Sequence, residues 1–300
     1  MTRPAGTSKT LQGHSRESLP NSKSTGSSKF KAPPNACDSH IHVVDNRRFP
    51  TSDGSGNADS SVDAYRLAQQ RIGTTRTVVV TPRPYVTDNR CTLDAISQLG
   101  VSAARGIAVV RPNITDAELT RLADGGICGI RFTVGGSAAV TSIDMIEPLA
   151  KRIQAFGWHL QLHMLGDQIA EHAGLLQRLE LPIVFDHMGR LPPPAGIKHP
   201  AFKVICGLLD QGRTWVKLSG AILHDSSNHR LPTPAELSEI AQAYLRAAPE
   251  RMVWGSDWPH GGDKGMPDDV ERFDEIAQWT ADDAIRRGIL VDNPQALYGF

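Results

Sequence analysis

The strongest constraint on the fold is a regular alternation of short apolar runs with longer amphipathic segments. Eight of the runs are predicted to be β-strands: residues 36–43, 76–81, 104–109, 127–133, 159–164, 183–187, 214–219 and 252–257. They are apolar throughout rather than alternating, which is typical of parallel strands that are covered by helices. Eight strand–helix units in about 260 residues match a (β/α)8 TIM barrel of the α/β class in both number and size.

Helices are predicted between the strands, at residues 62–72, 89–99, 116–123, 143–156, 167–179, 201–211, 235–247 and 270–279. Thr115 is placed to cap the third helix, and Gly157 to end the fourth. An open doubly wound sheet is the alternative fold, but no Gly-X-Gly-X-X-Gly motif follows an early strand. Residues 281–300 are expected to cover the outside of the barrel.

The N-terminal stretch differs in composition from the rest of the chain. Up to residue 31 it is rich in Ser, Thr, Lys, Gly and Pro, and Leu11, Leu19 and Phe30 are its only sizeable hydrophobic residues. Such a segment buries too little apolar surface to offset its loss of chain entropy. We therefore expect a disordered tail over residues 1–33, without the apolar region of a secretory signal, and a barrel domain over residues 34–300.

Charge and cysteine content narrow the classes of partner. The chain has 32 basic and 32 acidic residues, so nothing attracts it to nucleic acid or to an anionic membrane. No apolar run approaches the roughly 20 residues that cross a bilayer. The four cysteines are scattered and suit a reducing compartment. The sequence favours a cytoplasmic protein that acts on a small molecule, and it does not indicate an oligomeric state.

Polar residues recur where the predicted strands end, which is where TIM barrels carry their chemistry. In chain order they are His40, His42, Thr81, Arg83, Arg111, Arg131, Thr133, His163, His187, Ser219 and Asp257. A His-X-His pair alone arises often by chance, but four histidines and one aspartate at strand ends predict a common site. If the first strand alternates regularly, Asp38 shares a face with His40 and His42, and Cys37 and Ile41 lie opposite.

These histidines and Asp257 resemble the pattern of the amidohydrolase superfamily. Four further stretches narrow the resemblance: Phe-Asp-His-Met-Gly at 185–189, Val-Lys-Leu-Ser-Gly at 216–220, Trp-Gly-Ser-Asp-Trp-Pro-His at 254–260 and Asp-Asn-Pro-Gln-Ala-Leu-Tyr-Gly-Phe at 292–300. They are similar to the branch that holds 2-pyrone-4,6-dicarboxylate lactonase, D-galactarolactone isomerase and several sugar or muconolactone hydrolases. The resemblance extends over residues 34–300.

The resemblance bears on metal binding in two ways. Binuclear members are expected to carry a carboxylated lysine at the end of strand four, where this chain has Arg131, so a binuclear centre is not expected. A single zinc remains open, because His40, His42, His163 and Asp257 offer nitrogen and oxygen ligands. The pyrone lactonase is regarded as working without a metal, and we expect no obligatory metal here.

Ring opening of a lactone needs an activated water, a stabiliser for the oxyanion and a proton for the leaving oxygen. Asp257 is the predicted general base, and His40, His42 and His187 are predicted to polarise the carbonyl. Asp38 is expected either to orient an imidazole or to make a structural hydrogen bond.

Substrate binding is assigned to Arg131, His163, Arg83, Arg111 and Ser219. A guanidinium pairs with a carboxylate in a bidentate way, so Arg131 inside a strand predicts a substrate carboxylate or, alternatively, a salt bridge to Asp257 or Asp186.

Several functions fit this pattern. The first is hydrolysis of a carboxylated lactone, and the alternatives are a lactone isomerase, a zinc-dependent decarboxylase of the superfamily and a non-enzymatic binding module. In the pyrone-dicarboxylate lactonase we expect another arginine soon after the seventh strand. Here the corresponding stretch reads Ser-Gly-Ala-Ile-Leu-His over residues 219–224, and the next arginine is Arg230. A monocarboxylate lactone and a neutral sugar lactone therefore stay open beside the dicarboxylate.

Overall fold

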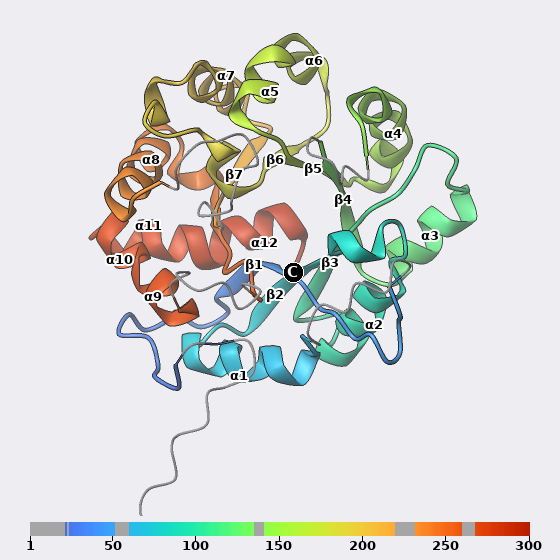
Figure 1. Ribbon diagram of the computed structural model, residues 1–300, viewed down its shortest axis with the longest axis horizontal. Coiled ribbons are helices and arrows are strands. Elements are labelled where there is room, and N and C mark those ends of the chain that lie inside the picture. The colour runs from blue at the N-terminus through green and yellow to red at the C-terminus, as the bar shows by residue number, and fades with distance from the viewer. Residues whose placement is uncertain (1–21, 23, 52–59, 135–140, 220–231, 260–267) are drawn as a thin grey trace, which may run out of the picture.

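The computed structural model describes residues 22, 24–51, 60–134, 141–219, 232–259 and 268–300. Within these residues eight parallel strands pair in chain order (Figure 1): β1 (Cys37–Ile41), β2 (Arg76–Val80), β3 (Ala104–Ala108), β4 (Ile127–Thr133), β5 (His159–His163), β6 (Ile183–Phe185), β7 (Thr214–Leu218) and β8 (Met252–Trp254). Beyond β8, the Asp257 N–H donates to the His40 carbonyl at 2.9 Å and the His42 N–H donates to the Trp258 carbonyl at 2.7 Å. These bonds join the last strand to the first, so the predicted (β/α)8 barrel is confirmed.

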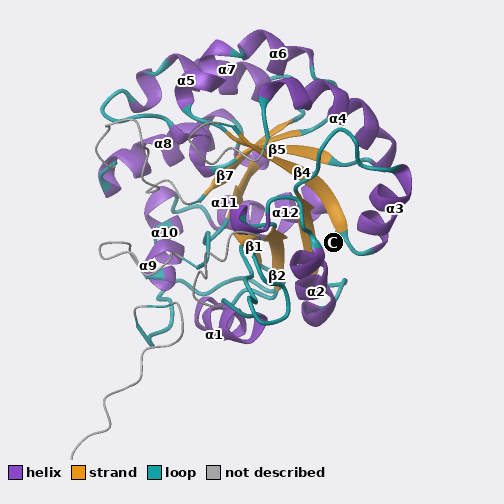
Figure 2. Ribbon diagram, turned by 45° about the vertical axis from the view of Figure 1, so that its right-hand side comes forward, coloured by secondary structure: helices purple, strands orange, loops and turns teal. Residues whose placement is uncertain are grey.

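Helices surround the strands on the outside (Figure 2). In the described part of the chain they are α1 (Val62–Ile72), α2 (Arg90–Leu99), α3 (Asp116–Asp124), α4 (Ile146–Ile153), α5 (Gly166–Glu171), α6 (Ala173–Arg178), α7 (Pro200–Leu209), α8 (Pro234–Ala247), α9 (Asp269–Asp274), α10 (Ile276–Trp279), α11 (Asp283–Arg287) and α12 (Asn293–Tyr298). The predicted helices at 167–179 and 270–279 are each divided in two. Thr115 caps α3 through a reciprocal bond with Glu118, as expected.

Strand β5 separates the apolar core under the helices from polar groups inside the barrel. On β5, Leu160 and Leu162 belong to the core shared with the helices, whereas Gln161 and His163 contact polar groups of neighbouring strands. This alternation follows from the two-residue period of a strand. The polar face of β5 therefore points to the barrel axis, where the candidate site lies.

The start of β1 departs from regular alternation. Asp38 pairs with Thr77 and Ile41 with Val79, so β1 has one residue more than β2 between these pairs. This β-bulge changes the face of the residues that follow. The Asp38 carboxylate accepts a hydrogen bond from the Tyr65 hydroxyl of α1, on the outer side of the barrel. The expectation that Asp38 shares a face with His40 and His42 is therefore wrong.

Both ends of the chain contact the barrel in ways that differ from expectation. Backbone N–H groups of Lys29 and Phe30 donate to the Asp274 carboxylate, and the Phe30 ring stacks on Phe273 with centroids 5.3 Å apart. Residues 24–33 are thus held against α9 rather than disordered, while residues 1–21 and 23 lie outside the described part.

At the other end, Tyr298 of α12 packs with the strand residues Cys37, Val78, Val80 and Ile107. The C-terminal segment therefore closes one end of the barrel instead of covering only its outer surface. None of the helices in the described ranges is long and apolar enough to cross a bilayer.

Candidate active site

Three predicted site residues meet where β8 lies beside β1. His40 Nε2 lies 3.3 Å from His42 Nε2 and 3.5 Å from Asp257 Oδ1, and His42 Nε2 lies 3.6 Å from the same oxygen. His40 is fully buried and Asp257 is 6% exposed, while the His42 side chain is partly open to solvent. The structure thus brings the strand-one histidines and the strand-eight aspartate into one triad.

The backbone around the triad is tightly constrained. A Cβ added to Gly255 would lie 2.7 Å from the His40 Cβ and 2.9 Å from the His40 nitrogen, so β8 approaches β1 this closely only with glycine. Asp257 and His187 have φ angles of 63° and 50°, which non-glycine residues rarely adopt. Each costs of order 1 kcal/mol, and such strained residues cluster at functional sites.

Burial keeps the triad histidines neutral. It lowers the pKa of His42, and it holds the pKa of His40 well below the usual histidine range. His42 Nδ1 lies 2.8 Å from the Val80 carbonyl, which can only accept, so Nδ1 carries the proton. His42 Nε2 therefore presents a lone pair to the other members of the triad.

Asp186 connects the triad to the opposite wall of the barrel. Its Oδ2 accepts hydrogen bonds from Arg131 Nε at 2.9 Å and from Gln161 Nε2 at 3.2 Å, and its Oδ1 lies 3.4 Å from His40 Nδ1. Although burial alone would raise it, the charge of Arg131 holds the pKa of Asp186 well below the usual range. Of the two alternatives for Arg131, the structure therefore shows the salt bridge to Asp186.

Lys217 is a second charged group beneath His40. Its ammonium is fully buried, donates to Gln161 Oε1 at 2.7 Å and to the Ser39 carbonyl at 2.8 Å, and lies 3.4 Å from His40 Nδ1. Burial lowers the pKa of Lys217 to about 8. Sequence reasoning missed both Lys217 and Asp186 as site residues, although a lysine inside an apolar strand is a signal for a buried partner.

His163 stands apart from the triad. Its Nδ1 lies 2.9 Å from an Arg131 guanidinium nitrogen and its Nε2 lies 2.9 Å from Arg190, so neither ring nitrogen faces His42 or Asp257. Burial, followed by the charge of Arg131, holds its pKa well below the usual range.

His187 lies between these groups, with its ring centroid 5.0 Å from that of His40. Its Nδ1 is 3.1 Å from Ser219 Oγ, and its buried Nε2 has no hydrogen-bond partner among the described residues. Burial lowers the pKa of His187 to about 4. Ser219 is thereby placed at the site as predicted, through His187.

The two loop arginines lie elsewhere. Arg83 is exposed in the short turn η1 (Arg83–Tyr85), and Arg111 is exposed in a cleft of about 430 Å³ that Arg90 and Arg121 also line. Their role in substrate binding stays a prediction.

The triad fits a divalent metal. Ligand atoms about 2.0–2.2 Å from a tetrahedral zinc lie roughly 3.3–3.6 Å from one another, and the three separations in the triad are 3.3, 3.5 and 3.6 Å. Asp186 Oδ1 lies 3.4 Å from His40 Nδ1, the ring nitrogen that would not bind the metal, as is usual for the carboxylate partner of a ligating histidine. In the described part of the chain, His163 does not belong to any such group.

The histidines and Asp257 lie at the strand ends of an eight-stranded barrel, which is where the active sites of TIM-barrel enzymes lie. The chain belongs to the amidohydrolase family, whose model matches residues 37–300.

The similar proteins include enzymes that hydrolyse or isomerise lactones. The chain is 32% identical over 281 residues to the 4-sulfomuconolactone hydrolase of Rhizobium radiobacter, covering 90% of this chain and 92% of that protein. It is 28% identical to the D-galactarolactone isomerase of Agrobacterium fabrum, over 78% of this chain and 80% of the isomerase. A crystal structure from Acinetobacter baumannii, described as a "probable 2-pyrone-4,6-dicarboxylic acid hydrolase" with citric acid bound, superimposes with a TM-score of 0.73 at 26% identity, covering 89% of this chain and 100% of that one.

Proposed function

We propose that the chain is a hydrolase that opens the ring of a small carboxylated lactone. The observation that carries this proposal is the triad, in which an aspartate lies within 3.6 Å of two neutral histidines at the end of a barrel. A carboxylate beside neutral imidazoles is suited to taking a proton from water at neutral pH. The similarity to the sulfomuconolactone hydrolase supports a lactone as the substrate.

Asp257 acts as the general base in this proposal. As it removes a proton from water, the water oxygen forms a bond to the lactone carbonyl carbon and the carbonyl oxygen becomes an oxyanion. When the intermediate collapses, the ring C–O bond breaks and Asp257 returns the proton to the leaving alkoxide. The product is a hydroxy acid, one water heavier than the lactone.

His187 is the proposed donor to the oxyanion. With the Ser219 hydroxyl donating to Nδ1, the neutral ring carries its proton on Nε2, which is buried and without a partner. A buried donor that lacks a partner is ready to stabilise charge that develops in the transition state. His40 and His42 form the adjoining wall of the site.

A divalent metal, when bound, would be held by His40, His42 and Asp257 and would polarise the lactone carbonyl as a Lewis acid. His187 supplies polarisation independently of these three residues. We therefore keep the expectation that a metal is not obligatory, and a chelator assay tests it.

Isomerisation of a lactone is the second candidate, favoured by the similarity to the galactarolactone isomerase. The same residues would move the acyl group between two hydroxyls of one substrate, without net addition of water. Mass spectrometry of the product separates the two reactions, because only hydrolysis adds one water.

A cytoplasmic location is proposed as well, and the four free cysteines support it.

A further inference from the structure

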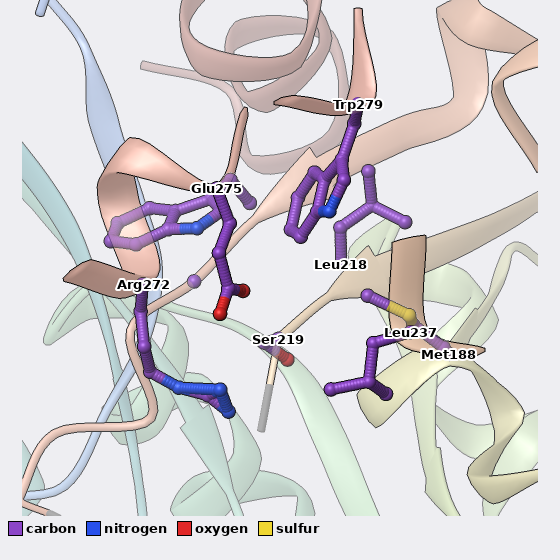
Figure 3. Close-up of a pocket in the computed structure, with 9 residues that line it drawn as sticks. Met188, Leu218, Ser219, Leu237, Arg272, Glu275 and Trp279 are labelled. Carbon is purple, nitrogen blue, oxygen red and sulfur yellow. The ribbon is translucent and has the colours of Figure 1, made fainter. Parts of the chain in front are cut away.

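A buried arginine whose side chain has no hydrogen-bond or salt-bridge partner among the described residues lies beside the site. Arg272, on α9, is 5% exposed, and within the described part of the chain its guanidinium makes neither a hydrogen bond nor a salt bridge, although burial raises the pKa of Glu275 and the charge of Arg272 helps to lower it. Figure 3 shows its side chain extending into a cavity near Glu275 and Ser219. A guanidinium taken out of water without hydrogen-bond acceptors is costly even when a carboxylate lies nearby. Its burial therefore indicates that a ligand supplies the missing acceptor.

The cavity adjoins the candidate site at two points. Ser219, which lines it, contacts His187, and Gly255, which also lines it, packs directly against His40. The cavity measures about 10 Å³, which is room for a single water. A space of this size suits the terminal oxygen of a ligand rather than a ring.

The other arginines considered for substrate binding are either held in a salt bridge or exposed. Arg131 pairs with Asp186 and His163, and Arg83 and Arg111 are exposed outside the triad. Arg272 comes from the helix after β8, not from the segment after β7 where the resemblance leads us to expect an arginine. It brings a guanidinium beside Ser219 from a different part of the chain.

We propose that Arg272 binds a carboxylate of the lactone substrate, remote from the ester that is opened. This inference rests on the proposed function and adds a substrate-binding residue to it. Glu275 lines the same cavity. It forms no salt bridge with Arg272 among the described residues, so the guanidinium keeps its donors for the ligand. The negative charge of Glu275 opposes an anion, and its removal should strengthen binding.

Steady-state kinetics with muconolactone and its neutral methyl ester test the proposal. Arg272→Met should raise KM for the acid by about 10- to 100-fold, the effect of losing hydrogen bonds to a charged group, and leave the ester unchanged. Arg272→Lys should restore part of the loss. Glu275→Gln should lower KM for the acid and not for the ester. Arg287→Met, on α11 with its side chain 57% exposed, is the matched control and should change neither.

Calorimetry with citrate as a carboxylate probe separates the failure of this inference from that of the proposed function. If the wild-type chain opens no lactone but Arg272→Met weakens citrate binding and Glu275→Gln strengthens it, the function is wrong and the anion site stands. If lactones are opened and Arg272→Met affects acid and ester equally, or Glu275→Gln does not strengthen citrate binding, the anion site is refuted. Because Glu275→Gln keeps Arg272 in place, the test survives even if Arg272→Met does not fold.

Discussion

Asp186 is the strongest candidate for a residue whose charge holds the barrel interior together. Asp186→Asn keeps the shape of the side chain and removes its charge, leaving two buried cations without their counter-ion. Arg131 Nε lies 2.9 Å and Lys217 Nζ lies 3.8 Å from the carboxylate. At an effective dielectric constant of about 20, these separations correspond to roughly 6 and 4 kcal/mol of attraction. Desolvation of the carboxylate offsets several kcal/mol, so we expect a net loss of about 3–5 kcal/mol.

Denaturant unfolding at pH 7 measures this loss. Asp94→Asn is a matched control, because Asp94 pairs with Arg48 at 2.5 Å on the surface, where the Arg48 side chain is 53% exposed. Such a pair is worth about 1 kcal/mol or less. The pKa of folded Asp186 lies well below the usual value, so its contribution is complete above about pH 4 and is lost as pH falls through the folded pKa. An Asp186→Asn variant no less stable than Asp94→Asn would refute this account of the interior.

Three further outcomes follow from the buried histidines and the triad. Burial lowers the pKa of His159 from 6.5 to about 3, so wild-type stability should decline as pH falls from 6.5 to 3, by about 2 kcal/mol at pH 5. Urea unfolding at pH 5 and pH 7 measures this effect. The His159→Leu variant should lose about 2 kcal/mol less unfolding free energy than the wild type between these pH values, and an equal loss would contradict the argument. Competition with a chromophoric chelator should show that His42→Asn weakens zinc binding more than about tenfold. His163→Asn should leave zinc binding unchanged. If both variants lost the same zinc affinity, His163 would have to be counted among the metal ligands. Lactonase activity should survive treatment with a chelator, and its abolition would make the metal obligatory.

Most of the fold could be predicted because the strands of a covered parallel barrel are apolar runs with helices between them. The residues at which the strands end were harder to predict. The run at 183–187 stops at Phe185, because the chain turns at His187 with a positive φ angle. The bulge in β1 was beyond sequence reasoning, since it depends on register with β2 and leaves no residue signature in Asp38.

The site was only partly predictable for a related reason. Histidines at strand ends can be recognised from their position in the sequence. Once the strands are located, the grouping of His40, His42 and Asp257 can be predicted from the closure of the barrel. The partner of a buried charge depends on which strands face each other across the barrel, so the chain alone left the pairing of Arg131 open. Gln161 could have been found because polar residues recur at every second position of β5, and Lys217 because it is a lysine inside an otherwise apolar strand. Arg272 could not, because it reaches the site from a helix.

The identity of the product tests the central claim most directly. Purified wild-type protein and Asp257→Asn are incubated with a panel of pyrone dicarboxylate, muconolactones and aldonolactones, and the products are weighed by mass spectrometry. We predict a wild-type product one water heavier than its lactone, and a loss of about 100-fold or more in the variant, as expected when a general base is removed. A product of unchanged mass, no turnover of any lactone, or an Asp257→Asn variant that retains most of the activity would contradict the proposal.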